Sequence, residues 1–500
     1  MMPTPKALPV GESPGRQERE GATARVHCRR ALVAAVVFLA PAPVACHAQR
    51  AAYLSEHLRG FVVADDSLIV IRDVTVIDGT GNPAREGLSI LIRDGRLVRI
   101  ARTVDVPSHA RVIDAAGQTA IPGLVMMHEH LFYRTEVGGR THYAPEPTTF
   151  PRLYLASGVT TIRTAGAHYP LLDLQVKRAI DRGELLGPDI DVTGPYLDGP
   201  RSSRYQNLRL RTPEEARNAV AIWADLGVTS VKAFTNLEPA ALRAAVEEAH
   251  ARGLKVTGHL CRTTWTDAIA AGIDNIEHGI LTASELVSDQ REGCFHPDVR
   301  AFLDTISVEA PAVRQIIRQM VDSRVALTAT LVRAECWPDR PTPGALRVLA
   351  PRAVRAFRVL CPEDGSLDEE ARLWIDATRL EQRFARAFSR AGGLLLSGTD
   401  PTLAGVVAGF GNHRQMELLA DAGFRPETVV MISSRNGAEY LGKLQEIGTL
   451  EAGKRADLFL IEGRIDTTMT AIRNVSLVFK DGIAFDARAI INSVDGLVGR

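Results

Sequence analysis

Short apolar, β-rich runs alternate with helical segments along most of this chain, and this alternation limits its fold more than any other feature. Each run is typical of a strand that is buried on both faces, because such strands are nearly continuous apolar stretches. The runs lie at 124–127, 158–163, 188–193, 229–234, 254–259, 274–278, 325–330 and 394–400. A capping box opens one of the intervening helices at Thr212. The strand–helix units predict an α/β fold, a (β/α)8 TIM-like barrel with its active site at the carboxyl ends of the strands.

The two ends of the chain share a different pattern, in which short β-rich runs are separated by hairpin turns. These runs occupy 68–100 near the N-terminus and 456–482 near the C-terminus. Alternating β-rich runs with Asp-Gly turns are typical of antiparallel hairpins. We therefore expect the N- and C-terminal segments to form one small β-sandwich domain that flanks the barrel.

The first residues have the character of a secretory signal. Arg25, Arg29 and Arg30 precede an apolar run at 31–40. A stretch of small residues typical of a cleavage site follows this run and ends at Ala48. This run is too short to anchor the chain in a bilayer, so we expect export to a secreted or periplasmic location, with no stable membrane span once the leader is removed. Lipidation at Cys46 is the alternative to cleavage. The expected organisation is a signal peptide at 1–48, a linker at 49–66, the β-sandwich at 67–121 and 446–487, the barrel at 122–445 and a C-terminal tail at 488–500.

The charge balance excludes two classes of partner. Lys plus Arg and Asp plus Glu both number 59, so the net charge is zero. Such a chain has no global field that would gather nucleic acid or an anionic membrane surface. A small-molecule substrate is the partner we expect, and the oligomeric state stays open, a homo-oligomer included.

Four cysteines remain after the leader, namely Cys261, Cys294, Cys336 and Cys361. None has the Cys-x-x-Cys spacing of a metal site, so each is expected to be buried or bridged. An oxidising compartment would permit a disulfide, which we expect among the last three because they share one irregular region. Connectivity cannot be deduced from the sequence.

The first predicted strand ends with two histidines at a spacing that is typical of metal ligands. His128 and His130 are two residues apart, so in a strand they point to the same side while Glu129 points away. Further polar residues lie on or at the end of later strands: Lys232, His259, His278 and Asp400. Each would need its own partner in a largely apolar barrel, and a metal centre would satisfy all of them.

These motifs resemble the amidohydrolase superfamily of metal-dependent hydrolases, most closely its imidazolonepropionase-like and Xaa-Pro dipeptidase-like branch. The resemblance covers residues 67–486 and rests on Pro122-Gly123-Leu124, His128-x-His130, Gly158-Val159-Thr160-Thr161, Lys232, Gly258-His259, Glu277-His278-Gly279, Gly398-Thr399-Asp400 and the segment 448–457. Met126 departs from the pattern, since many members carry an aspartate there that orients the histidine pair.

The resemblance implies a binuclear centre. One metal would be held by His128, His130 and Asp400, and the second by His259 and His278, with Lys232 bridging both as a carbamate formed with carbon dioxide. An unmodified ammonium would be repelled by two cations. If Lys232 instead pairs with a carboxylate, the site is mononuclear. Nitrogen and oxygen ligands suit zinc, although manganese, iron or cobalt would also fit.

The implied reaction is hydrolysis of an amide, peptide-like or cyclic amide bond by a metal-activated hydroxide, with Asp400 as the general acid and base. The substrate would be a dipeptide or an N-acyl amino acid. Candidate substrate contacts are Tyr133, Arg163, His168 and Tyr196, with ordinary packing as the alternative for each. His296 and His413 are further candidates, and Glu277 is expected to point away from the ligands in a structural role.

Three alternatives stay open. The same ligands would serve a lactone or cyclic-imide hydrolase, or a deaminase, although deaminases of this superfamily usually lack the bridging lysine, so Lys232 argues against that activity. A non-catalytic barrel that serves as a scaffold is the third, and the filled set of ligand positions argues against it.

Overall fold

The computed structural model describes residues 50–137, 140–202, 204, 206–287, 299–334, 343–360, 369–402 and 405–500. The expected signal peptide with Cys46 lies outside these ranges, as do Cys294, His296, Cys336 and Cys361. Within the described ranges, no helix is both long enough and apolar enough to cross a membrane.

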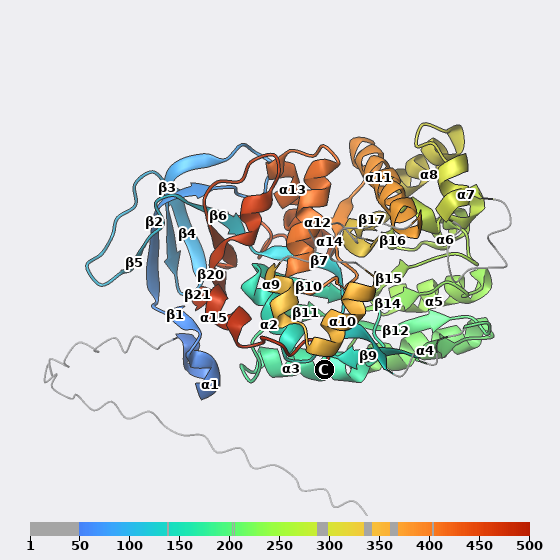
Figure 1. Cartoon of the computed structure of the whole chain (residues 1–500), viewed down its shortest axis with the longest axis horizontal. Coiled ribbons are helices and arrows are strands. Elements are labelled where there is room, and N and C mark those ends of the chain that lie inside the picture. Colours follow the sequence, from blue (N-terminus) through green and yellow to red (C-terminus); the bar gives the residue numbers. More distant parts are fainter. Residues whose placement is uncertain are drawn as a thin grey trace, which may run out of the picture. The chain divides into compact units, whose positions relative to one another are not determined.

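Parallel strands at eight positions of the described chain form the barrel and confirm the predicted α/β fold (Figure 1). They are β7 (Leu124–Glu129), β10 (Val159–Thr164), β11 with β12 (Asp189–Asp191 and Thr193–Asp198), β14 (Ser230–Ala233), β15 (Lys255–Gly258), β16 (Asn275–His278), β17 (Ala326–Ala329) and β18 (Leu395–Ser397). Neighbouring positions pair in sequence order. The last joins the first just beyond β18, where the backbone amides of Thr399 and Asp400 both donate to the carbonyl oxygen of His128 at 3.0 Å. This closure brings the ends of the first and last strands together.

Helices connect the strands, as the sequence predicts. The main ones are α2 (Thr149–Ala156), α3 (Pro170–Asp181), α4 (Pro213–Leu226), α5 (Pro239–Ala251), α6 (Trp265–Ala271), α8 (Pro311–Asp322), α11 (Glu369–Arg390), α12 (Phe410–Asp421), α13 (Pro426–Ser433) and α14 (Arg435–Tyr440). The expected cap of α4 is present, because the amide of Glu215 donates to Oγ1 of Thr212 at 3.1 Å. Gly227 ends this helix with a φ of +101°, a conformation that glycine adopts without strain.

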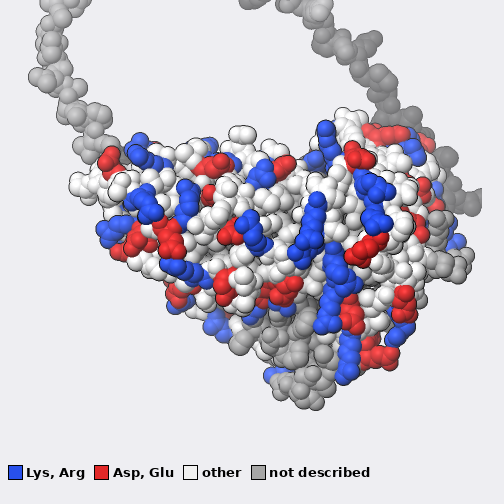
Figure 2. Space-filling view, turned by 90° about the horizontal axis from the view of Figure 1, so that it is seen from above, with Lys and Arg blue, Asp and Glu red and all other residues white. Residues whose placement is uncertain are grey.

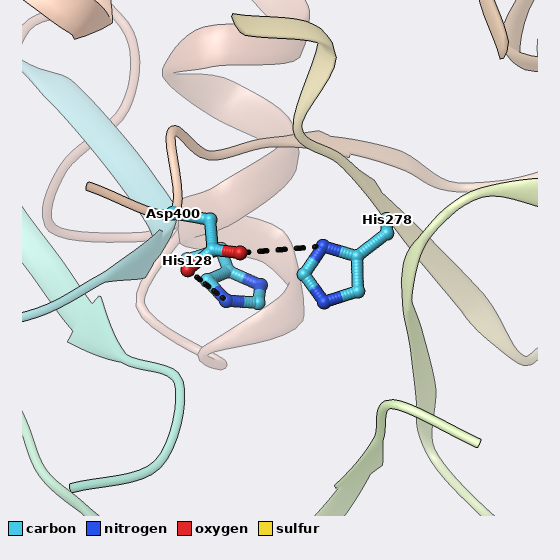
Figure 3. A group of neighbouring side chains, drawn as sticks. All are labelled: His128, His278 and Asp400. Carbon is cyan, nitrogen blue, oxygen red and sulfur yellow. Dashed lines mark ion pairs between the residues drawn. The ribbon is translucent and has the colours of Figure 1, made fainter. Parts of the chain in front are cut away.

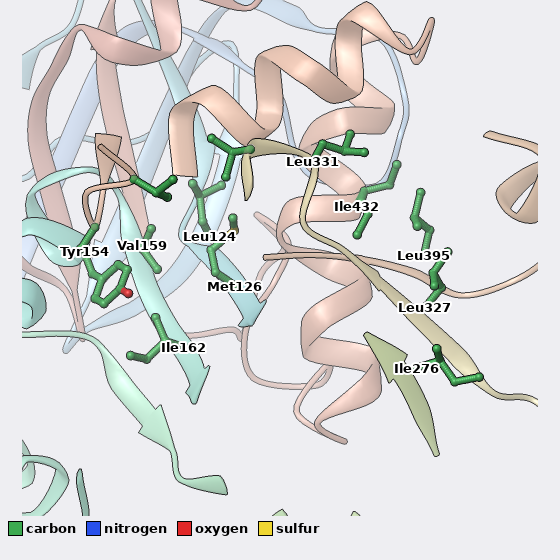
Figure 4. Packing of buried hydrophobic residues seen from close by; sticks show 14 of the residues in the cluster. Leu124, Met126, Tyr154, Val159, Ile162, Ile276, Leu327, Leu331, Leu395 and Ile432 are labelled. Atoms are coloured by element: carbon green, nitrogen blue, oxygen red, sulfur yellow. The ribbon is translucent and has the colours of Figure 1, made fainter. Parts of the chain in front are cut away.

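The barrel strands are held by a large apolar cluster. Figure 4 shows part of it, with Leu124 and Met126 of β7, Val159 and Ile162 of β10, and Leu327 of β17. All five side chains are fully buried. Burying a side chain of this size stabilises the fold by roughly 1.5–3 kcal/mol, so this packing helps to hold the strands that carry the site.

Strands from the two ends of the chain form the small β domain. They are β1 (Val62–Ala64), β2 (Leu68–Val76), β3 (Arg85–Arg93), β4 (Arg96–Ala101), β5 (Arg111–Asp114), β6 (Gln118–Pro122), β19 (Leu458–Glu462), β20 (Val475–Lys480) and β21 (Ile483–Asp486). They make one nine-stranded sheet in which β19 lies between β6 and β20. Side chains from both ends share one buried cluster, which includes Ile69, Ile90 and Phe479. The two ends therefore fold as one unit, as predicted.

Two segments are more ordered than we expected. Residues 50–66, assigned as a linker, contain η1 (Arg50–Tyr53), α1 (Glu56–Arg59) and β1, and β1 pairs with β21. The expected tail at 488–500 continues α15 (Ala487–Asn492), and the amide of Gly499 donates to Glu146 at 2.6 Å. Both segments are therefore part of the fold, held by partners more than 300 residues away in sequence.

Several short elements follow the barrel strands. A hairpin of β8 (Phe132–Val137) and β9 (Arg140–Pro145) comes directly after β7, and the short strand β13 (Leu208–Arg209) pairs with β12. The described parts of the segments 281–311 and 336–365 include helices. The short helices in or next to these segments are η2 (Ile280–Thr282), η3 (Ser284–Leu286), α7 (Val299–Thr305), η5 (Leu331–Ala334), α9 (Pro343–Val348) and α10 (Pro351–Leu360).

Charged side chains of both signs are interspersed on the face drawn in Figure 2. This distribution agrees with the zero net charge of the sequence. On that face, the structure shows no large region of one sign among the described residues.

Candidate metal centre

The end of β7 presents two histidines to one side, as alternation predicts. His128 and His130 are both buried, with 2% and 1% of their surfaces exposed. Glu129 points the other way, where its Oε1 atom accepts hydrogen bonds from the amide of Thr399 at 3.1 Å and from Nδ2 of Asn412 at 2.9 Å. Glu129 therefore ties the segment that carries Asp400 to β7.

Each of these histidines has its Nδ1 atom occupied. Nδ1 of His128 lies 2.7 Å from Oε2 of Glu277, and Nδ1 of His130 lies 3.0 Å from the carbonyl oxygen of Gly166. A carbonyl oxygen or an ionised carboxylate only accepts hydrogen bonds, so both Nδ1 atoms carry a proton. In the neutral rings the two Nε2 atoms are then left with free lone pairs.

Asp400 faces both lone pairs. Its Oδ1 atom lies 3.2 Å from Nε2 of His130 and 3.6 Å from Nε2 of His128, and its Oδ2 atom lies 3.8 Å from Nδ1 of His278. Figure 3 shows His128, His278 and Asp400 converging on one point. One ligand atom from each of these three buried residues can be chosen so that all lie within 4.8 Å of one another. This is a set of nitrogen and oxygen donors with the spacing of a metal site.

The carboxyl group of Asp400 is ionised in this setting. Burial alone would raise its pKa, but the neighbouring His128, His130 and His278 outweigh burial and hold the pKa of Asp400 well below its usual value. Burial also lowers the pKa of His130, even though Asp400 opposes this effect. An ionised carboxylate therefore faces the imidazole nitrogens, and an electron-pair acceptor between them would satisfy all of these groups.

Glu277 is the residue that sequence reasoning placed wrongly. It does not point away from the cluster, because His278 adopts a φ of +73° and this left-handed backbone interrupts the alternation of the strand. Oε1 of Glu277 accepts from Nη2 of Arg163 at 2.6 Å and from the hydroxyl of Thr257. Burial would raise the pKa of Glu277, yet Lys232, Arg163 and His128 hold it well below the usual value. Glu277 thus gives His128 the orienting carboxylate that Met126 does not supply.

Lys232 is buried beside this network without a hydrogen bond. Only 1% of its surface is exposed, and its Nζ atom has no hydrogen-bond partner among the described residues. Oε1 of Glu277 lies 3.6 Å away. Burial lowers the pKa of Lys232 to about 8, with Glu277 opposing this shift and Arg163 adding to it. The amine is therefore deprotonated more easily than an ordinary lysine.

The last two predicted ligands lie together at the ends of β15 and β16. The rings of His259 and His278 are 4.4 Å apart, and the rings of His278 and His128 are 4.7 Å apart. The Oγ1 atom of Thr330 lies 2.9 Å from Nδ1 of His278. His278 and Asp400, with φ of +73° and +48°, both hold uncommon backbone conformations of the kind that cluster at functional sites.

Two of the four predicted substrate contacts have other partners. The hydroxyl of Tyr133 accepts a hydrogen bond from the amide of Gly405 at 2.9 Å, and burial raises the pKa of Tyr133 to about 12. Arg163 donates to Glu277 and, through Nε, to the carbonyl oxygen of Met127 at 2.8 Å. Both predictions are corrected: Tyr133 supports the loop that contains Gly405, and Arg163 supports Glu277.

The side chain that reaches the histidines from β8 is instead Phe132. Its ring stacks on that of His130 at 4.6 Å with an interplanar angle of 28°. The other two predicted contacts lie nearby, since the rings of Tyr196 and His130 are 6.4 Å apart and those of His168 and Tyr196 are 5.1 Å apart. Phe132 lies two residues from His130, so both side chains lie on the same side of the extended chain. This spacing could have identified Phe132 from the sequence.

Two further expectations concern single residues. Nε2 of His413 lies 2.8 Å from the carbonyl oxygen of Ser157, so His413 is a core residue and not a substrate contact. Cys261 is disulfide-bonded, whereas we expected a bridge among the three later cysteines. The sequence had given no reason to single out Cys261, because disulfide connectivity depends on which chain segments the fold brings together.

The chain is similar to known proteins in its fold and in part of its sequence. The solved structure of a putative prolidase from Bifidobacterium longum superimposes with a TM-score of 0.60 at 24% identity, covering 86% of this chain and 99% of that one. An N-acyl-D-aspartate deacylase from Alcaligenes xylosoxydans xylosoxydans is 29% identical over 41% of this chain and 39% of its own length. A dihydroorotase from Mycobacterium tuberculosis is 26% identical over 35% of this chain and 38% of its own length. The chain thus spans about two-fifths of the length of the curated relatives it matches.

The family comparison covers far more of the chain. The sequence model of the Amidohydrolase family matches residues 119–484, which include every barrel strand and every donor described above. The match begins in β6 and ends in β21, so it also takes in part of the small β domain. The chain belongs to the amidohydrolase family.

Proposed function

We propose that this chain is a metal-dependent hydrolase of amide bonds. The observation that carries the proposal is the convergence of Nε2 of His128 and Nε2 of His130 on the carboxylate of Asp400, within 3.6 Å. Electron-pair donors held this close repel one another unless a proton or a metal ion lies among them. Since the pKa of His130 is lowered, a divalent cation is the better occupant.

The donors fit such an ion. His128, His130 and Asp400 would hold the first metal, and His259 and His278 would hold the second. Imidazole nitrogens and carboxylate oxygens are the ligands that catalytic zinc sites use, so zinc is the metal we propose. The partners of the Nδ1 atoms, Glu277 and the Gly166 carbonyl, fix the two rings of β7 and raise their basicity.

Lys232 would bridge the two metals as a carbamate. Its neutral amine would attack the carbon of carbon dioxide, so that a nitrogen–carbon bond forms while one carbon–oxygen π bond opens onto its oxygen. One proton would pass from the nitrogen to solvent water, giving an anionic group with two oxygen donors. The buried amine without a hydrogen bond, and its pKa of about 8, support this modification. The carbamate would also place negative charge between two cations that would otherwise repel each other.

A bound divalent ion lowers the pKa of a water molecule and polarises a carbonyl group. Asp400 would accept the proton of the attacking water and then donate it to the leaving nitrogen, because its carboxylate is ionised at neutral pH. Glu129 would keep Asp400 in place through its hydrogen bonds to Thr399. His278 would be held by Thr330.

The substrate that we propose is a dipeptide or an N-acyl amino acid. The similarity to a prolidase structure and to an N-acyl-D-aspartate deacylase supports this class. The partial match to a dihydroorotase favours a second candidate, a cyclic amide, whose ring carbon–nitrogen bond the same donors could attack.

Hydrolysis by the metal-loaded protein tests the proposal. The enzyme, supplied with zinc and bicarbonate, would be assayed for amine release from dipeptides, N-acyl amino acids and cyclic amides. Asp400→Asn should lower the rate of the best substrate by roughly 10²–10⁴-fold, whereas Asp421→Asn, on α12 away from the cluster, should leave it unchanged. Hydrolysis that survives Asp400→Asn or complete removal of metal would contradict the mechanism.

Export stays a proposal as well. The leader at 1–48 would direct the chain to the periplasm or the exterior, where it would be cleaved after Ala48 or lipidated at Cys46. N-terminal sequencing and mass measurement of the protein recovered from each cell fraction distinguish these outcomes from retention with an intact leader.

A further inference from the structure

A row of aromatic side chains leads away from one end of the donor cluster and returns to the other. We call it the aromatic wall, made of Phe132, Tyr143, His168, Tyr196 and Phe234. Its ring centroids follow one another at 4.6 Å from His130 to Phe132, 4.6 Å to His168, 5.1 Å to Tyr196, 5.0 Å to Phe234 and 5.2 Å to His259. Tyr143 lies 4.4 Å from His168 on the same wall. The wall therefore links a proposed ligand of the first metal to a proposed ligand of the second.

The wall is built at the carboxyl ends of the first four barrel positions. Phe132 and Tyr143 come from the hairpin after β7, His168 follows β10, Tyr196 lies on β12 and Phe234 follows β14. This is the face where barrels of this fold bind their substrates. The flat faces of these rings suit an apolar or aromatic group beside a reacting bond.

His168 is the polar exception within this wall. It is 6% exposed, and neither of its ring nitrogens has a hydrogen-bond partner among the described residues. Burial, with Arg204 and His130 nearby, lowers the pKa of His168 to about 3, so the ring is neutral. A neutral imidazole has one donor and one acceptor, and leaving both unused in an apolar setting is costly. A ligand that offers an acceptor at this place would satisfy the N–H of His168 and remove that part of the cost.

A positive charge adjoins the wall. The guanidinium of Arg204 lies 5.1 Å from the ring centre of Phe234 and 6.0 Å from that of Tyr143. After burial, Arg204 is the next cause of the lowered pKa of His168, and it opposes the rise that burial causes in the pKa of Tyr196, so its charge is within electrostatic reach of both side chains. An anionic group beside His168 would therefore interact with the N–H of the imidazole and with a cation at once.

We propose, resting on the amide hydrolase function proposed above, that this wall is a substrate subsite for a free carboxylate joined to an aromatic group. The carboxylate lies between His168 and Arg204, and the aromatic group packs on the rings of Phe132, Tyr196 and Phe234. Among amides of the proposed class, the subsite selects acyl or peptidyl derivatives of aromatic amino acids over those of small or uncharged ones. His168 and Arg204 are its specificity-determining residues.

Binding of three small ligands to the metal-loaded protein tests this subsite by calorimetry, without any turnover. The ligands are 3-phenylpropanoate, which has both groups, 3-phenylpropanamide, which lacks the charge, and butanoate, which lacks the ring. We expect 3-phenylpropanoate to bind at least about tenfold more tightly than either of the others, since one hydrogen bond to a charged group is worth roughly that factor. Equal affinity for the three ligands would overturn the proposal.

Variants assign the effect to the named residues. His168→Phe keeps an aromatic ring but removes the hydrogen bond, and Arg204→Gln removes the charge; each should weaken 3-phenylpropanoate about tenfold. His168→Gln keeps a donor and should recover part of the loss. Arg209→Gln, on the exposed neighbouring strand β13, is the matched control and should bind as the wild type does.

The controls separate the subsite from the proposed reaction. If the carboxylate simply bound the metal, Arg204→Gln and Arg209→Gln would behave alike, and the proposal would be wrong. If the protein hydrolysed no amide but still discriminated the three ligands through His168 and Arg204, the hydrolase proposal would fail while the subsite stood. Melting temperature and metal content, measured on each variant, show that a loss of binding comes from the missing group.

Discussion

The Nδ1 atom of His128 lies 2.7 Å from Oε2 of Glu277, so a carboxylate at the end of β16 orients a histidine at the end of β7. The same carboxylate accepts from Arg163 at 2.6 Å. Two residues before the first histidine this chain has Met126, which cannot accept a hydrogen bond as a carboxylate does. In this chain, Glu277 therefore connects the proposed metal site to the charged network that includes Arg163 and Lys232.

Glu277→Gln should weaken metal binding without removing any ligand. The amide keeps the shape of the carboxylate but loses the charge that fixes the proton on Nδ1 of His128, and loss of such an orienting group typically costs 10–100-fold in metal affinity. The free energy of unfolding of the variant should also fall by roughly 3 kcal/mol, because the positive charge of Arg163 stays buried without a carboxylate to pair with it. Competition with a chromophoric chelator measures the first effect and denaturant unfolding the second.

Glu417→Gln is the matched control for that experiment. Glu417 is also buried on the helix α12, where it accepts from Arg473 at 2.6 and 2.7 Å, and it is not one of the donors. Its variant should lose a comparable amount of stability while metal affinity stays as in the wild type. Equal losses of metal affinity in the two variants would show that Glu277 acts only through general destabilisation.

Gly398→Ala should disturb the closure of the barrel. A Cβ atom at Gly398 would lie 2.4 Å from Cβ of His128 and 2.6 Å from its backbone nitrogen, so the backbone of one strand end has to shift. Overpacking of this kind costs roughly 1–3 kcal/mol or more, and here it also moves His128 away from Asp400. We expect lower unfolding free energy together with lower metal content.

Gly60→Ala provides the comparison for Gly398→Ala. At Gly60 a Cβ atom would meet nothing within 4 Å, and its φ of −62° suits any residue. Its unfolding free energy should change by less than about 0.5 kcal/mol. A Gly398→Ala protein as stable and as metal-rich as Gly60→Ala would contradict the close approach of the two strand ends.

Glu146 should make stability depend on pH. Burial raises the pKa of Glu146 to about 7 from a usual value of 4.5, although hydrogen bonds from Thr149 and Gly499 oppose the shift. Between these values the folded chain holds a proton that the unfolded chain has released, so this contribution is full below pH 4.5 and is lost as pH rises toward 7. The loss is of the order of 3 kcal/mol at most.

Glu146→Gln tests this expectation, because glutamine stays neutral. Its melting temperature should vary less between pH 5 and about 7.5 than that of the wild type, whereas a variant of the exposed Glu214 should follow the wild type. Parallel curves for Glu146→Gln and wild type would mean that Glu146 does not titrate in this window.

Local sequence signals were sufficient for the barrel and for the residues that form the donor cluster. The strands are apolar runs, and polar residues at their ends stand out because an apolar barrel offers them no partners. His128, Asp400 and His278 could thus be grouped although 272 residues separate the first from the last in the chain. Their proposed metal roles remain predictions.

The errors came from features that local sequence does not encode. Alternation failed at Glu277 because the next residue, His278, takes a left-handed backbone. Tyr133 was predicted to reach the mouth of the barrel because it follows the histidine strand closely, yet its hydroxyl accepts a hydrogen bond from Gly405, a partner 272 residues away. The linker expected at 49–66 contains β1, which is only three residues long and gains its order by pairing with β21. Long-range pairing decided the last two of these cases, and the backbone conformation of a single residue decided the first.

The number of metal ions per chain tests the central claim most directly. We predict about two zinc ions per chain in the wild-type protein after incubation with zinc and bicarbonate, and one or fewer in Lys232→Ala. Elemental analysis of both proteins, with the wild type dialysed against chelator as the blank, gives these values. No bound metal in the wild type, or two ions retained in Lys232→Ala, would contradict a lysine-bridged binuclear centre.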